Sequence, residues 1–143
     1  MDRTYNLNEL AMMTGFTTRT LRNYLNQGLL KGKKPDGVWQ FSADDLDKFF
    51  NEPFVKEGLR IKRSSAVFDF LAEKKKRERR TCVILDVPVT VTEGNELSLF
   101  FCREMENVTD VTFSFGRDSG MGRIILTGAE DQVAKIMKAY YAR

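Results

Sequence analysis

Five polar residues in one short segment have the side chains and the spacing needed to read a DNA base sequence. A hydroxyl residue opens the segment as a helix N-cap, and arginine and asparagine follow on one side of the predicted helix. Arginine can bind guanine through two hydrogen bonds in the major groove, and asparagine can bind adenine in the same way. The segment therefore predicts contact with double-stranded DNA, with ordinary solvated polar residues as the alternative. The residues concerned are Thr17, Thr18, Arg19, Arg22 and Asn23.

Three lysines follow shortly after this predicted helix. Lys31, Lys33 and Lys34 lie on a predicted hairpin whose tip contains the turn sequence Pro35-Asp36-Gly37. Lysine ammonium groups neutralise phosphates, which gives a salt-dependent share of binding that is independent of base sequence. We therefore expect phosphate contacts here, and a solvated hairpin tip is the alternative. Trp39, on the return strand, is predicted to pack in the core rather than to stack on bases.

Two short helices joined by a tight turn are predicted to position these side chains. Thr14-Gly15-Phe16 separates the helices, and in a helix-turn-helix the second helix enters the major groove. Gly28 is predicted to end the second helix, and Ser42 is predicted to cap a third. The predicted elements are a helix at 7–13, a helix at 18–26, a hairpin at 30–41 and a helix at 43–51.

Many residues in the first third of the chain agree in order and spacing with one known family. They are Glu9-Leu10-Ala11, Thr14-Gly15, Arg19-Thr20-Leu21-Arg22, Tyr24, Gly28-Leu29-Leu30 and Phe41-Ser42 with Asp45-Leu46. This pattern resembles the winged helix-turn-helix of MerR-type regulators and excisionase-like proteins. The resemblance implies that residues 1–52 form a DNA-binding domain and that the Tyr24 hydroxyl donates to a phosphate. A core tyrosine is the alternative for Tyr24.

Charge is distributed unevenly along the 143 residues. Residues 1–80 contain 17 lysines and arginines against 11 acidic residues, whereas residues 81–143 contain 6 against 9. This difference indicates that only the first part of the chain meets a polyanion. The alternative is that the excess lysines are solvated and serve solubility.

The composition argues against several classes of function. The chain has no histidine, which removes the commonest general base and any Ser-His or Cys-His pair. Cys82 and Cys102 lack metal-ligand spacing and are expected to be buried free thiols. We therefore predict no catalytic residue, no cofactor, no metal and no enzymatic activity. A polar N-terminus and the lack of a long apolar run predict a cytoplasmic protein without a membrane partner.

The middle of the chain is predicted to form one long helix. Residues 53–80 contain few turn signals, and Phe54, Ile61 and Phe68 recur every seven positions. This spacing predicts a linker helix that packs in a dimer, and an unpaired surface helix is the alternative.

Residues 81–143 show the element order β-α-β-β-α, which predicts a small α+β unit for dimerisation or effector binding. Gly116–Gly122 is predicted to be a hairpin turn rather than a phosphate loop, because it lacks Gly-Lys-Ser/Thr and leads into a strand. Four aromatic residues could line an effector pocket, although their spacing is more typical of a core. They are Phe100, Phe101, Phe113 and Phe115.

The predicted fold class is α+β, with an N-terminal winged helix-turn-helix, a linker helix and a C-terminal β-α-β-β-α unit. The favoured function is a homodimeric, sequence-specific transcriptional regulator of MerR-like type, because one small module binds DNA weakly. Double-stranded DNA is the expected partner, and RNA polymerase or an unknown effector are further candidates. One alternative is an excisionase-like architectural protein that bends DNA for a recombinase. The others are a regulator controlled by a small molecule in its C-terminal unit and a catalytic C-terminal unit.

Overall fold

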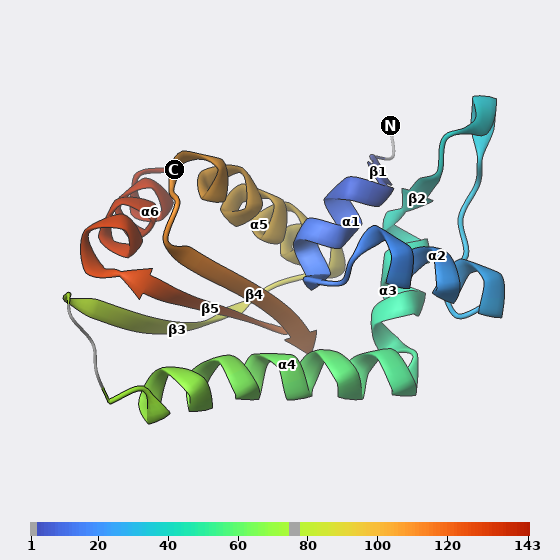
Figure 1. Ribbon diagram of the computed structural model, residues 1–143. Coiled ribbons are helices and arrows are strands. Elements are labelled where there is room, and N and C mark those ends of the chain that lie inside the picture. The colour runs from blue at the N-terminus through green and yellow to red at the C-terminus, as the bar shows by residue number, and fades with distance from the viewer. Residues whose placement is uncertain (1–2, 75–77) are drawn as a thin grey trace. The chain divides into compact units, whose positions relative to one another are not determined.

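The computed structural model describes residues 3–74 and 78–143 (Figure 1). The chain divides into two compact units, Met1–Leu59 and Arg60–Arg143. The division falls within one helix, α4 (Pro53–Ala72), so that this single element contributes to both units. The fold class is α+β, as predicted, and each unit is described by itself below.

Three helices and a two-stranded sheet form the N-terminal unit together with the start of α4. The three helices predicted from the sequence are confirmed, and each predicted boundary lies within one residue of the observed one. The elements are β1 (Thr4–Asn6), α1 (Leu7–Thr14), α2 (Thr18–Gln27), the 3-10 turn η1 (Pro35–Gly37), β2 (Gln40–Ser42) and α3 (Ala43–Asn51).

Reciprocal side-chain caps fix the residues at which α1 and α3 begin. Asn6 Oδ1 accepts from Glu9 N at 2.7 Å, and Glu9 Oε1 accepts from Asn6 N at 3.0 Å. Ser42 and Asp45 form the same pair of bonds at 3.0 and 2.9 Å. These bonds satisfy amide groups that the first helical turn leaves without a partner, so each helix has a defined start.

The segment predicted as a hairpin, residues 30–41, is mostly a loop. A single bridge closes it, with Lys33 N donating to Gln40 O at 2.9 Å and Gln40 N donating to Lys33 O at 2.7 Å. The chain turns beyond this bridge at Pro35–Gly37, and the strand of the return arm begins only at Gln40. The prediction that Trp39 lies on the return strand was therefore wrong. We call residues 31–39 the wing loop.

Strand β2 pairs with β1, an antiparallel pairing that the sequence analysis missed. Tyr5 lies opposite Phe41 in the register, and the two side chains are only 1% and 0% exposed. The pair thus joins the start of the chain to the start of α3 and buries two large rings between the helices. Its strands are three residues long, too short for an alternating pattern to be visible in the sequence.

Helix α4 is shorter than the helix predicted at 53–80. It ends at Ala72, and Glu73 N donates to Asp69 O at 3.1 Å to complete the last turn. Lys74, Glu78 and Arg79 are not helical, and residues 75–77 lie outside the described residues. The helix cannot continue to residue 80 because Arg80 already belongs to a strand, and Arg79 O accepts from Glu130 N at 3.0 Å.

The C-terminal unit has the predicted order β-α-β-β-α. Its antiparallel sheet has the strand order β3-β5-β4. Strands β4 and β5 form a hairpin whose turn consists of Ser119 and Gly120, so the turn predicted at Gly116–Gly122 is confirmed but is shorter. The elements are β3 (Arg80–Pro88), α5 (Val91–Glu104), the 3-10 turn η2 (Met105–Asn107), β4 (Val111–Asp118), β5 (Met121–Ala129) and α6 (Glu130–Ala142).

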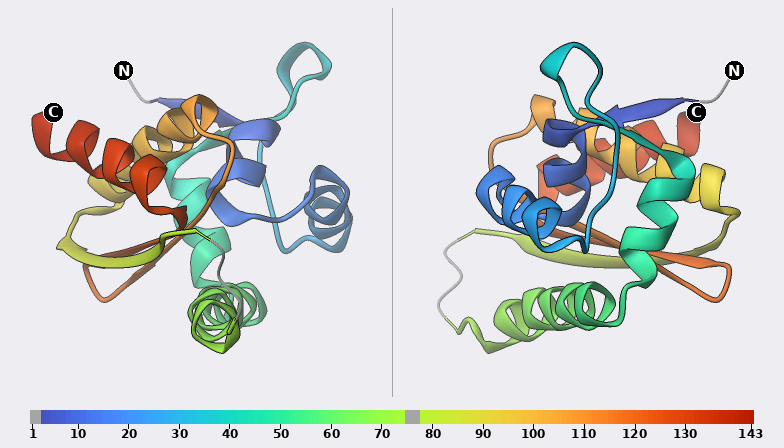
Figure 2. Two further views of the ribbon diagram at one scale, coloured as in Figure 1. Left: turned by 60° about the vertical axis from the view of Figure 1, so that its left-hand side comes forward. Right: turned by 90° about the vertical axis from the view of Figure 1, so that its right-hand side faces the viewer.

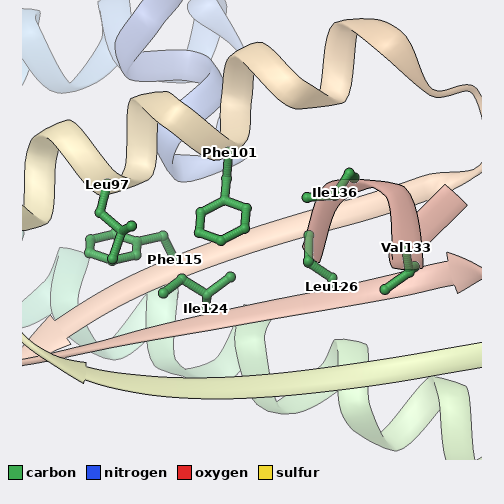
Figure 3. Close-up of a cluster of buried hydrophobic side chains, with 7 residues drawn as sticks. All are labelled: Leu97, Phe101, Phe115, Ile124, Leu126, Val133 and Ile136. Atoms are coloured by element: carbon green, nitrogen blue, oxygen red, sulfur yellow. The ribbon is translucent and has the colours of Figure 1, made fainter. Parts of the chain in front are cut away.

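Helices α5 and α6 cover one face of this sheet, and the core of the unit lies between them and the strands (Figures 1 and 3). The Phe101 ring stacks on Phe113 with centroids 5.6 Å apart and also contacts Phe100. The four aromatic residues considered as a pocket lining therefore pack in the core. The buried cluster consists of Leu97, Phe101, Phe115, Ile124, Leu126, Val133 and Ile136.

Candidate nucleic-acid interface

Helix α2 has one buried side and one exposed polar side. Leu21 is completely buried and anchors the inner side of the helix. Arg19, Arg22, Asn23 and Asn26 are exposed and lie three or four residues apart, which places them on one face of an α-helix. We call these four residues the α2 polar face. Its donors can form hydrogen bonds with base edges, because guanidinium and amide groups match guanine and adenine.

The turn before α2 is held by hydrogen bonds from one threonine. Thr14 Oγ1 donates to Leu10 O at 2.8 Å and accepts from Phe16 N at 3.1 Å. Gly15, between these residues, has a φ of 77°, a conformation that a residue with a Cβ rarely adopts. The turn therefore has a defined geometry, and this geometry sets the angle between α1 and α2.

Thr17 caps the start of α2. Its Oγ1 accepts from Thr20 N at 3.1 Å and donates to Thr20 Oγ1 at 3.0 Å. The first turn of α2 contains no acidic residue, whereas α1, α3, α5 and α6 each have at least one there. The partial positive charge at this N-terminus is thus not offset by a side chain of its own turn, which favours an approaching phosphate.

Tyr24 lies in a group of aromatic rings on the other side of α2. Its ring is 5.6 Å from Phe16, 6.0 Å from Phe49 and 6.3 Å from Phe54, measured between centroids. These contacts join α2 to α3 and to the first turn of α4. The ring is half-buried, so Tyr24 has a packing role whether or not its hydroxyl reaches DNA.

The wing loop carries three exposed lysines, Lys31, Lys33 and Lys34, and extends away from the helices of its unit (Figure 2). Lys34 Nζ lies 5.3 Å from the centre of the Trp39 ring, within the range of a cation–π interaction. The Trp39 ring in turn stacks on buried Phe41, with centroids 6.1 Å apart. Trp39 therefore packs on the core of the unit, as predicted.

The predicted DNA-contacting residues occupy α2 and the wing loop, and most of them are exposed. Thr18 and Tyr24 are half-buried, and Thr17 is engaged as a cap. In the part of the chain that the structure describes, neither arginine of α2 nor any of the three wing lysines forms an ion pair with a carboxylate. Sequence analysis omitted Asn26, although its distance of three residues from Asn23 places it on the same face.

Comparison with known families assigns this part of the chain. Residues 5–51 match the family model described as MerR HTH family regulatory protein. These residues are thus similar to the helix-turn-helix of MerR-type regulators. The match covers about a third of the chain, confirms the resemblance found in the sequence and indicates a DNA-binding transcriptional regulator. No curated protein and no solved structure matches the chain.

The described residues offer little for metal binding, membrane insertion or thiol chemistry. Within residues 3–74 and 78–143, no group of three or more histidine, cysteine, aspartate or glutamate side chains is arranged to hold a metal ion. The same residues include no helix that is long and apolar enough to span a bilayer. Cys82 and Cys102 are free thiols, and burial raises the pKa of Cys82.

The cap at the start of α2 can be tested by mutation. Thr17→Ala removes the acceptor for Thr20 N and should lower the free energy of unfolding by about 1 kcal/mol. Thr17→Ser keeps the hydroxyl, so its free energy of unfolding should fall much less. The single tryptophan, Trp39, lies in this unit and reports its unfolding in urea by fluorescence. Equal stability of the alanine and wild-type proteins would contradict the role of the cap.

Proposed function

We propose that the protein is a sequence-specific, double-stranded DNA-binding transcriptional regulator of MerR-like type that acts as a homodimer. The observation that carries this proposal is the α2 polar face, which is exposed, cationic and free of carboxylate partners within the described residues. A buried Leu21 on the opposite side gives this face a fixed direction. Such a helix can lie in the major groove with its N-terminal half against the bases.

The residues of the helix have different proposed roles. Arg19, Arg22 and Asn23 contact base edges, because they have the donors that distinguish guanine and adenine. Thr17 and Thr18 lie at the helix N-terminus, where backbone amides and hydroxyls suit a phosphate. The Tyr24 hydroxyl is a further phosphate donor, held in position by the aromatic rings around it.

The wing loop provides the second part of the proposed interface. Its lysines neutralise phosphates beside the groove that α2 occupies, and each such contact releases counterions from the DNA. The packing of Lys34 on Trp39 limits the freedom of this ammonium group before binding. The loop therefore adds affinity, whereas α2 adds sequence specificity.

A homodimer is proposed because one small DNA-binding module gives limited affinity and two copies can read two half-sites. Helix α4 has apolar side chains that the chain itself leaves uncovered: Phe54, Ile61, Phe68 and Leu71 are 65%, 55%, 70% and 72% exposed. The first three recur every seven residues, the period of a helix that packs along a partner helix. In this proposal residues 1–52 bind DNA, residues 53–80 link the subunits, and residues 81–143 contribute to dimerisation.

The base-reading role is tested by Arg19→Ala and Arg22→Ala. Each should weaken binding to a selected DNA site by roughly 1–3 kcal/mol, because a bidentate contact to a base is lost. Fluorescence anisotropy with labelled DNA gives the affinities, and Arg103→Ala, an exposed arginine on α5, is the matched control. If both α2 variants bind as tightly as the control, α2 does not lie in the groove.

The wing loop is tested by Lys33→Ala combined with Lys34→Ala. This variant should bind specific and random DNA more weakly by the same factor, and the slope of log affinity against log salt should fall by about 2. Lys48→Ala, an exposed lysine on α3, should leave the slope unchanged. An unchanged slope in the double variant would remove the wing loop from the interface.

The dimer is tested by Ile61→Ser combined with Phe68→Ser, measured by sedimentation equilibrium. Because both side chains are more than half exposed, the variant should fold, and it should shift from dimer to monomer. Val38→Ser removes an exposed apolar side chain from the wing loop, outside the segments proposed to form the dimer, and should remain dimeric. A monomeric wild-type protein, or a double variant that remains dimeric, would refute the proposed role of α4.

A further inference from the structure

A cleft of about 280 Å³ lies in the C-terminal unit between the second half of α4 and the sheet. Figure 1 shows this half of α4 on the sheet face opposite α5 and α6, which is the face that borders the cleft. Its polar lining consists of Arg60, Arg63 and Ser64 from α4 and Arg123 from β5. Three guanidinium groups thus surround one small space, which is an unusual lining for the contact between a helix and a sheet.

The side of α4 that faces the sheet is more polar than is usual for a helix packed on strands. A helix usually turns its apolar side to a sheet, but here Val67 is the one apolar residue that α4 contributes to the lining of the cleft. The exposed Ile61 and Phe68 are not part of that lining. Packing alone therefore does not explain why α4 directs arginines toward the strands.

The arginines are held by contacts that leave the cleft open. Arg123 donates to both carboxylate oxygens of Asp86, at 2.8 and 2.9 Å, which fixes its guanidinium on the sheet. The Arg63 guanidinium lies over Gly116, where a Cβ atom would come within 2.0 Å of it. Gly116 is the register partner of Arg123, so the guanidiniums of Arg63 and Arg123 lie over the neighbouring strands β4 and β5. The missing side chain at Gly116 makes room for Arg63.

The electrostatic environment of Arg63 disfavours its positive charge. Burial lowers the pKa of Arg63, and the nearby positive charge of Arg123 lowers it further, while Asp118 acts in the opposite direction. An anion in the cleft would compensate for burial and for the charge of Arg123, because it supplies a counter-charge and hydrogen-bond acceptors.

An unsatisfied hydroxyl lies on the same face of the sheet. Ser114 is the register partner of Ile125, which lines the cleft, and paired residues of antiparallel strands point to the same face. Ser114 Oγ is buried and has no hydrogen-bond partner among the described residues. A buried hydroxyl without a partner is costly, and this one is paired in register with a residue of the cleft, although Ser114 is not itself part of the lining.

The geometry points to a binding site for a small organic oxyanion, a carboxylate or phosphate monoester with a short apolar body. Guanidinium groups bind the oxygens of a planar carboxylate or a tetrahedral phosphate through paired hydrogen bonds. Val67, Ile84 and Ile125 form the apolar part of the lining and suit the body of the ligand. The site lies wholly within the C-terminal unit, so it does not depend on the proposed DNA interface.

The test is a calorimetric titration of the full-length chain with phenyl phosphate, inorganic phosphate and phenol, in the absence of DNA. Phenyl phosphate should bind at one site and more tightly than inorganic phosphate, because only the former also contacts the apolar lining. Phenol, which lacks the charge, should not bind. No saturable binding of either phosphate, or equal affinity for both, would overturn the proposal. Either failure would leave the DNA-binding proposal untouched.

Two variants locate the site. Arg63→Gln removes a guanidinium, and Gly116→Ala displaces Arg63 by a single methyl group that meets only the end of a flexible side chain. Each should weaken binding of phenyl phosphate by about tenfold or more, as expected for loss of a charge-assisted hydrogen bond. Arg103→Gln, an exposed arginine outside the cleft, should bind as the wild type does. An equal loss of affinity for phenyl phosphate in Arg103→Gln would mean that only the overall charge of the protein attracts the anion.

Discussion

The burial of Leu21 is the constraint on which the rest of the proposed DNA interface depends. Because Leu21 is completely buried, the orientation of α2 about its own axis is fixed. The residues of the α2 polar face, spaced three and four positions apart, therefore face outward. The hydrogen bonds of Thr14 and Thr17 then fix the place where the helix begins. Apolar packing thus determines the direction of the polar residues, although it forms no contact with DNA itself.

The two units use arginine in different ways. On α2 the guanidiniums are exposed and have no carboxylate partner in the described part of the chain, as a surface that meets a polyanion requires. In the C-terminal unit Arg63 and Arg123 surround a small cleft, and Asp86 already binds one of them. The first arrangement suits an extended phosphate backbone, and the second suits one small anion. Helix α4 contributes residues to both units.

Local signals allowed much of the fold to be predicted from the sequence, and features that depend on distant residues were missed. The caps Thr17 and Ser42 and the terminating Gly28 are local signals that predicted helix boundaries in the N-terminal unit. The pairing of Tyr5 with Phe41 was missed because the strands are short and far apart in the chain. The cleft was missed because Arg63, on α4, is far along the chain from Gly116 and Arg123, and these residues come together only in the folded C-terminal unit.

Selection of bound fragments from a random double-stranded DNA library, at low and at moderate salt, shows whether the protein reads a base sequence as a dimer. We expect enrichment of one inverted repeat at both salt concentrations, because two copies of α2 would read two half-sites. Binding that shows no enrichment would fit an architectural protein rather than a sequence-specific regulator. Failure to retain any DNA, even at low salt, would contradict the proposed function of the α2 polar face.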